Sequence, residues 1–139
     1  MKTLTCFLSI ILFTASCKKE NVNTKKEVNN PDNIYGKWHW VSSSGGIAGL
    51  TETPKTAGYT MGVDYNRNNV FRRYKNGDVI NSAKFTIVKT KGVFGMDSTY
   101  VIKYTPDNFD HVVITAKRDS LVLTDNISDG YTTLYIKDK

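Results

Sequence analysis

Residues 59–80 read YTMGVDYNRNNVFRRYKNGDVI, and this stretch decides the fold. Along its first part, apolar or aromatic side chains alternate with polar or small residues, so that Tyr59, Met61, Val63 and Tyr65 share one face. A period of two is typical of a strand that is buried on one side only. Asn76-Gly77 is a strong signal for a tight hairpin, because both residues tolerate the positive φ that a type I′ turn requires. The stretch therefore predicts strands at 59–66 and 70–75, and a third that begins at 79.

The same alternation continues on both sides of this stretch, with turn signals every eight to twelve residues. It predicts eight strands in all, at 35–43, 59–66, 70–75, 79–89, 98–104, 111–117, 121–125 and 131–137. The one helical feature that we expect is a short turn around 49–55. Eight short strands with brief connections most simply close as an all-β, antiparallel up-and-down barrel, because closure removes the unpaired strand edges. A two-sheet sandwich is the alternative architecture.

The N-terminus has the three parts of a secretory signal. Lys2 supplies a positive charge, residues 6–15 (CFLSIILFTA) are almost entirely apolar, and small residues precede Cys17. The apolar run has about half of the ~20 residues that a membrane-spanning helix needs, which argues against a transmembrane anchor. We therefore expect residues 1–16 to be a signal peptide.

Thr14-Ala15-Ser16-Cys17 resembles the lipobox of bacterial lipoproteins, although Thr14 stands where leucine is commonest. The resemblance implies that Cys17 is lipidated, palmitate included, and anchors the mature protein in the cell envelope, at the outer membrane or the cell surface. Ordinary cleavage and a soluble secreted product remain the alternative. The other cysteine, Cys6, leaves with the signal, so the mature chain has no thiol left for a disulfide or a metal.

Residues 17–33 are the expected lipidated cysteine and a disordered tether, because Val22 and Val28 are the only apolar residues after Cys17. Residues 34–139 are then the single folded domain. The whole chain carries a net charge of +6. Nucleic-acid binding requires basic residues gathered with aromatic ones. Arg67, Arg72, Arg73 and Lys75 do cluster in the sequence beside Phe71 and Tyr74, but we interpret them as a solvated strand edge in an exported protein and expect no nucleic-acid partner.

Gly36-Lys37-Trp38 resembles the G-x-W motif that opens the lipocalin barrel, and the run from Gly36 to Pro54 is similar to a family of bacterial lipocalin-like lipoproteins. The resemblance implies that Gly36, Trp38 and Trp40 are structural, with Trp38 packed across the closed end of the barrel beneath a basic residue. Arg118 is the candidate for that residue. It also implies that the barrel binds a small hydrophobic molecule, without catalysis and without a cofactor.

An aromatic-rich set on alternating positions is the candidate for the ligand-binding wall: Tyr59, Met61, Val63, Tyr65, Phe85, Ile87, Tyr100, Ile102 and Tyr104. Apolar rings with orienting hydroxyls suit a small-molecule cavity. The same residues equally suit the plain core of a filled barrel. In that case the protein is a structural or interaction module, such as an accessory subunit or an inhibitor, whose partner the sequence does not identify.

Catalysis has little support in the sequence. His39 and His111 are the only histidines, and Asp110-His111 is the one pair that could act as an acid and a base or bind a metal. The scattered aspartates fall mostly at strand ends and turns, where they have structural reasons to occur. The Gly/Ser-rich segment 42–49 lacks the G-K-[S/T] of a phosphate-binding loop and is expected to be a flexible loop over the barrel mouth. We therefore expect neither catalytic residues nor a metal site.

Overall fold

The computed structural model describes residues 30–92, 95 and 98–139 of the chain. It contains a 3-10 helix, η1 (Pro31–Ile34), one short helix, α1 (Pro54–Ala57), and nine strands. The strands are β1 (Gly36–Gly45), β2 (Leu50–Glu52), β3 (Met61–Tyr65), β4 (Val70–Lys75), β5 (Asp78–Thr90), β6 (Thr99–Thr105), β7 (His111–Ala116), β8 (Ser120–Asp125) and β9 (Tyr131–Lys137). Expected strands 70–75 and 131–137 have the observed bounds, and the others differ by one or two residues at one or both ends.

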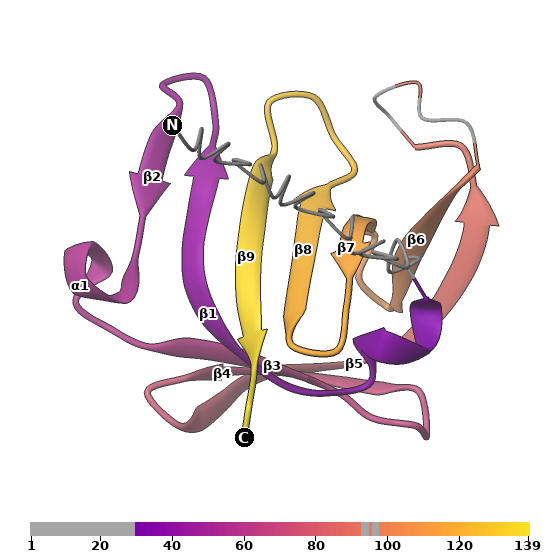
Figure 1. Cartoon of the computed structure of the whole chain (residues 1–139), viewed down its shortest axis with the longest axis horizontal. Helices are drawn as coiled ribbons and strands as arrows, with labels where there is room; N and C mark the ends of the chain where they lie inside the picture. Colours follow the sequence, from indigo (N-terminus) through magenta and orange to yellow (C-terminus); the bar gives the residue numbers. More distant parts are fainter. Residues whose placement is uncertain (1–29, 93–94, 96–97) are drawn as a thin grey trace, which may run out of the picture.

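The strands form one antiparallel barrel of eight strands, as the alternation predicts (Figure 1). Each strand from β3 to β9 pairs with the next, and β1 pairs with both β3 and β9, which closes the ring. The sandwich alternative is thereby excluded. β2 stands outside the ring, where it pairs only with the last three residues of β1, Ser43 to Gly45.

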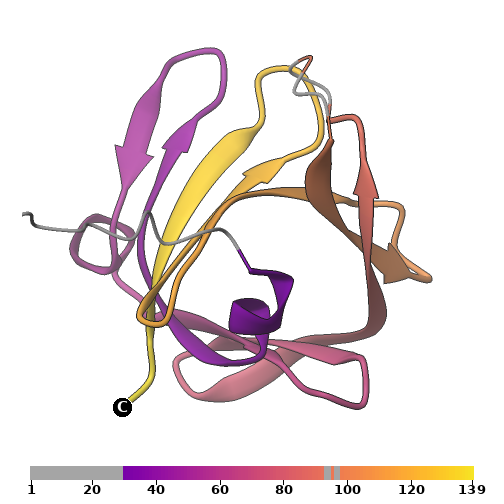
Figure 2. The same cartoon turned by 45° about the vertical axis from the view of Figure 1, so that its right-hand side comes forward.

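One end of the barrel is closed. η1 lies across the ring of strands when the barrel is viewed from that side (Figure 2), and the side chain of Ile34 is fully buried there. Trp38 packs beneath η1 and donates a hydrogen bond from its indole Nε1 to the carbonyl oxygen of Ile34 at 2.7 Å. The Nζ of Lys137, on the last strand, lies 4.1 Å from the centre of the Trp38 ring. Lys137 therefore holds the position for which we expected Arg118.

The folded domain also begins earlier than expected. Pro31, Asp32 and Asn33 belong to η1 rather than to the tether, and the amide of Asn33 donates to the carbonyl of Ala116 at 3.1 Å. The expected helical turn is likewise displaced, since Leu50 to Glu52 form β2 and the turn runs over Pro54–Ala57 with Thr53 as its N-cap. Cys17, the signal segment and the tether up to residue 29 lie outside the described residues.

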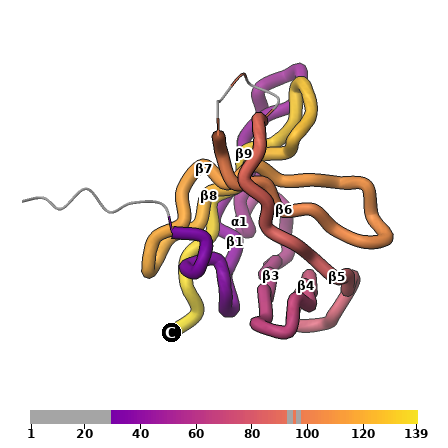
Figure 3. Tube along the Cα trace, turned by 90° about the vertical axis from the view of Figure 1, so that its right-hand side faces the viewer, coloured from indigo at the N-terminus to yellow at the C-terminus, as the bar shows by residue number. Residues whose placement is uncertain are grey.

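The opposite end of the barrel is open. At its rim, β1, β4, β6 and β8 end and β3, β5, β7 and β9 begin. The register shows this, because Gly45 is paired with Tyr131, Lys75 with Asp78, and Asp125 with His111. The loop between β6 and β7 projects on the side away from η1 (Figure 3). The closed half is filled by large side chains, chiefly Trp38, Tyr65, Phe85, Ile102 and Leu121. The open half holds interior space that large side chains do not fill.

Candidate functional site

The open end of the barrel contains a cavity of about 200 Å³, which we call the mouth cavity. Its walls combine apolar and polar side chains from six strands and the β6–β7 loop: Ser43, Met61, Val63, Arg73, Phe109, His111, Asp125, Thr133 and Tyr135, with the backbone at Gly62. A smaller cavity of about 20 Å³ lies beside it, between Arg73, Tyr104 and Phe109. That volume suffices for one water molecule, whereas the mouth cavity has room for a small organic molecule.

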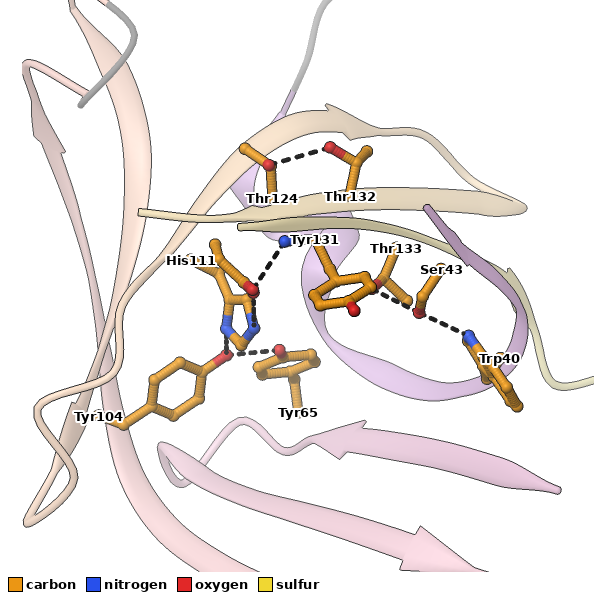
Figure 4. A network of polar contacts seen from close by, with 10 residues as sticks. Trp40, Ser43, Tyr65, Tyr104, His111, Thr124, Tyr131, Thr132 and Thr133 are labelled. Carbon is orange, nitrogen blue, oxygen red and sulfur yellow. Dashed lines mark hydrogen bonds and ion pairs between the residues drawn. The ribbon is translucent and has the colours of Figure 1, made fainter. Parts of the chain in front are cut away.

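A β-bulge places Ser43 in the mouth cavity. The pairing of β1 with β9 shifts by one residue between Trp40 and Ser42, so the strand turns Ser43 rather than Ser42 inward. Ser43 Oγ accepts a hydrogen bond from Trp40 Nε1 at 2.9 Å and lies 2.9 Å from Thr133 Oγ1 (Figure 4). Bulges commonly redirect a side chain in this way next to binding sites.

A chain of polar contacts runs from the mouth into the core (Figure 4). The Tyr65 and Tyr104 hydroxyls are 2.7 Å apart, and the Tyr104 hydroxyl lies 2.9 Å from His111 Nδ1. On the other side of the ring, His111 Nε2 lies 3.6 Å from the carboxylate of Asp125, which also accepts from the backbone N–H of Tyr131 at 2.8 Å. The negative charge of Asp125 favours the His111 proton on Nε2. Nδ1 then accepts from Tyr104, and Tyr104 accepts from Tyr65.

Burial determines the charge states of the side chains in this hydrogen-bond network. It lowers the pKa of His111 to about 4, with a further contribution from the positive charge of Arg73 and a weaker opposing one from Asp110, so the ring is neutral at pH 7. Burial likewise raises the pKa of Tyr135 to about 12 and raises those of Tyr65 and Tyr104. All three phenols therefore keep their protons and can donate hydrogen bonds.

The depressed pKa of His111 predicts a specific loss of stability in acid. In the unfolded chain the ring has a pKa of about 6.5, so between pH 6.5 and pH 4 the unfolded state binds a proton that the folded state does not. The contribution is fully present above pH 6.5 and is lost as the pH falls towards 4. Urea unfolding at pH 7 and pH 4.5 should show that the protein loses about 2–3 kcal/mol more than the His111→Gln variant. Equal losses in the two proteins would contradict the account.

The nine expected ligand-binding residues all belong to the core cluster or pack against it, so the alternation identified the inward face correctly. Only part of the set reaches open space. Met61 and Val63 line the mouth cavity, and Tyr104 lines the small cavity beside it. The other six do not line the mouth cavity: Tyr59, Tyr65, Phe85, Ile87, Tyr100 and Ile102. Of these, Tyr65, Phe85 and Ile102 are completely buried in the filled half.

Several polar features lie in other places than the sequence suggested. His111 does not pair with Asp110, which instead forms an ion pair with Lys103 at 3.0 Å. Half of the Gly/Ser segment is strand, because residues 42–45 belong to β1, and residues 46–49 form the turn that leads to β2. The expected basic cluster is divided among different surroundings, with the Arg67 guanidinium over the ring of Tyr35 and the Lys75 ammonium over the ring of Tyr59.

A larger hollow of about 500 Å³ lies on the outer face of the barrel, against β1, β3 and the β4–β5 turn. Several of its polar side chains already satisfy one another: His39 Nε2 lies 3.0 Å from the Asp138 carboxylate, and Asn76 accepts from the Thr60 backbone N–H at 2.9 Å. The mouth cavity differs because it lies inside the barrel, where two polar side chains, described below, face it without a partner among the described residues. We therefore place the candidate site in the mouth.

Within residues 30–92, 95 and 98–139, no three His, Cys, Asp or Glu side chains gather closely enough to hold a metal ion. No helix in the same part of the chain is long and apolar enough to cross a membrane. Comparison of the chain with protein-family models, with curated proteins and with solved structures finds no match.

Proposed function

We propose that this protein is a lipid-anchored, lipocalin-like binding module of the cell envelope that holds a small molecule in the open end of its barrel. The observation that carries the proposal is the difference between the two ends. One end is sealed by Trp38 and η1, while the other contains the mouth cavity with apolar and polar walls. Concave sites with apolar walls and a few convergent polar groups are the usual form of small-molecule sites.

The size of the mouth cavity restricts the ligand. Pockets for drug-sized molecules have volumes of roughly 300–1,000 Å³, and an engineered cavity of about 150 Å³ holds benzene. A volume of about 200 Å³ suits one ring with a substituent, or a short branched chain. A long acyl chain does not fit, because buried side chains that include Trp40, Phe71, Tyr104 and Leu123 belong to the packed core of the barrel. The expected hydrophobic ligand is therefore a small one with a polar end.

The anchor in this proposal is Cys17, which precedes the described domain by about a dozen tether residues. A lipidated lipoprotein cysteine carries three acyl chains, two through a thioether-linked glyceride and one on its amino group. Three chains bind a bilayer far more firmly than a single chain, which gives only marginal attachment. Cells grown with labelled palmitate should incorporate it into the protein and into a Cys6→Ala variant, but not into a Cys17→Ala variant. Labelling of the Cys17→Ala protein would contradict the assignment.

The binding role is tested by titrating the purified protein with small ring compounds, benzoate and benzamide, by isothermal titration calorimetry. At least one should bind, and a Met61→Trp variant, whose larger side chain fills the mouth, should lose that binding while melting cooperatively. If the folded Met61→Trp variant binds as well as the original protein, the mouth is not the site. If neither compound binds the original protein, the alternative role of an interaction module with a filled barrel is favoured. The packed closed half of the barrel is consistent with that alternative.

A further inference from the structure

Arg73 is the mouth residue whose chemistry the barrel itself does not use. Arg72 and Arg73 are neighbours on β4 but point to opposite sides of the barrel wall. Arg72 lies on the outside, with Nη1 3.9 Å from the Asp64 carboxylate. Arg73 lines both the mouth cavity and the small cavity beside it. Among the described residues its guanidinium has no ion pair and no hydrogen bond, and its one ring contact is with Phe71 at 5.8 Å.

The charge of Arg73 acts on groups that line the mouth and on phenols in the core beside it. It lowers the pKa of His111 and opposes the rise in the pKa of Tyr65, Tyr104 and Tyr135, groups that lie on four different strands. A guanidinium keeps its charge at any pH that a folded protein meets, and it offers five N–H donors in a planar fork that matches a carboxylate. An arginine that faces a cavity without a partner therefore lacks an anion.

Tyr135 supplies a second donor. Its side chain is 7% exposed, and its hydroxyl has no hydrogen-bond partner among the described residues. Every fully buried side-chain nitrogen or oxygen in the described part of the chain does have a partner, so the Tyr135 hydroxyl is not one of these and opens onto the mouth cavity that its residue lines. A buried phenol that keeps its proton and faces a cavity can donate to an acceptor placed there.

The opposite wall limits the charge of the ligand. In the closed ring of eight strands, β8 lies four positions away from β4, so Asp125 faces the mouth from the side opposite Arg73. Its carboxylate is already engaged by the Tyr131 N–H and lies beside His111. A ligand that carried a second negative charge at its far end would meet this carboxylate and be repelled.

We propose that the mouth cavity binds a small apolar monocarboxylate, with its carboxylate on the Arg73 guanidinium and the Tyr135 hydroxyl and its apolar body against Met61, Val63 and Phe109. The inference rests on the proposed binding function and names the ligand class of that site. Hydrogen bonds between charged partners are about twice as strong as neutral ones, so the carboxylate carries most of the selectivity.

The test compares three probes in calorimetric titrations of the purified protein at pH 7: benzoate, its neutral amide benzamide, and terephthalate, which has a second carboxylate across the ring. Benzoate should bind at least about tenfold more tightly than either of the others. An Arg73→Met variant should lose that preference, with its benzoate affinity reduced to about that for benzamide. A Tyr135→Phe variant should bind benzoate about three- to tenfold more weakly.

The matched control is Arg72→Met, which removes the same charge from the neighbouring position on the outside and should leave benzoate binding unchanged. Thermal melts of all variants establish that they are folded. Equal binding of benzoate and benzamide by the original protein would overturn the carboxylate assignment while leaving the binding function intact. Binding of neither probe would count against the binding function itself. Equal weakening by Arg72→Met and Arg73→Met would show that the attraction comes from net charge and not from the mouth.

Discussion

Replacing Trp38 with alanine is expected to lower the free energy of unfolding by about 3–5 kcal/mol, the range for truncation of a large buried aromatic side chain. The side chain is 1% exposed at the closed end of the barrel. Its removal leaves a cavity beneath η1, deprives the Ile34 carbonyl of its indole donor, and takes away the ring over which the Lys137 ammonium lies. The change therefore combines lost packing with polar groups that lose their partners.

Urea unfolding followed by tyrosine and tryptophan fluorescence measures this loss. Ile136→Ala is the control, because this side chain lies on the neighbouring strand β9 but is 50% exposed, and its truncation should change the free energy by about 0.5 kcal/mol or less. A loss below about 1.5 kcal/mol for Trp38→Ala would mean that the closed end is not sealed as described.

Replacing Tyr104 with phenylalanine is expected to lower the free energy of unfolding by about 2–6 kcal/mol, although only one oxygen atom is removed. That oxygen joins the Tyr65 hydroxyl at 2.7 Å to His111 Nδ1 at 2.9 Å. Without it, a buried donor and a buried acceptor both lose their partners, and each such group costs about 1–3 kcal/mol.

Tyr65→Phe is the matched control for Tyr104→Phe. Tyr65 is the end of the hydrogen-bond chain, so its removal leaves the Tyr104 hydroxyl still donating to His111. We expect a loss of about 1 kcal/mol, measured by the same urea titration. If Tyr65→Phe destabilised the protein as much as Tyr104→Phe, the assignment of Tyr65 as the donor to Tyr104 and of Tyr104 as the donor to His111 would be wrong.

The barrel could be predicted from the sequence because each strand has one face in the core and because Asn, Gly, Pro and Asp mark the turns between the strands. Trp38, Val63 and Phe85 were all placed inward by alternation, and all are buried. β2 could not be predicted, since its three residues are exposed and carry no alternation. Its pairing depends on β1 continuing past the residues that pair with β3, which leaves that edge of β1 free for β2.

Bulges limited the prediction of which residues face the interior. In β7 the register shifts between Val113 and Thr115, so that Val113 and Ala116 both belong to the core although they are three residues apart. The corresponding shift in β1 brings Ser43 into the mouth. Strict alternation assigns such residues to the wrong face, and nothing in a single sequence marks where a strand gains a residue.

The polar part of the site was missed for two different reasons. Arg73 lies two residues after Phe71, so its inward position could have been read from alternation, but we interpreted it as one of several surface charges. The partnership of His111 with Asp125 could not have been read, because it depends on the register between β7 and β8 and not on nearness in the sequence.

The central claim, that the open mouth is the binding site, is tested most directly by methyl NMR of the protein titrated with benzoate. The methyl signal of Thr133, which lines the mouth cavity and not the outer hollow, should shift along a saturation curve. The methyl signals of Leu121, buried at the closed end, and Thr60, in the outer hollow, should stay in place. Shifts of Thr60 without Thr133 would move the site to the outside of the barrel and contradict the account.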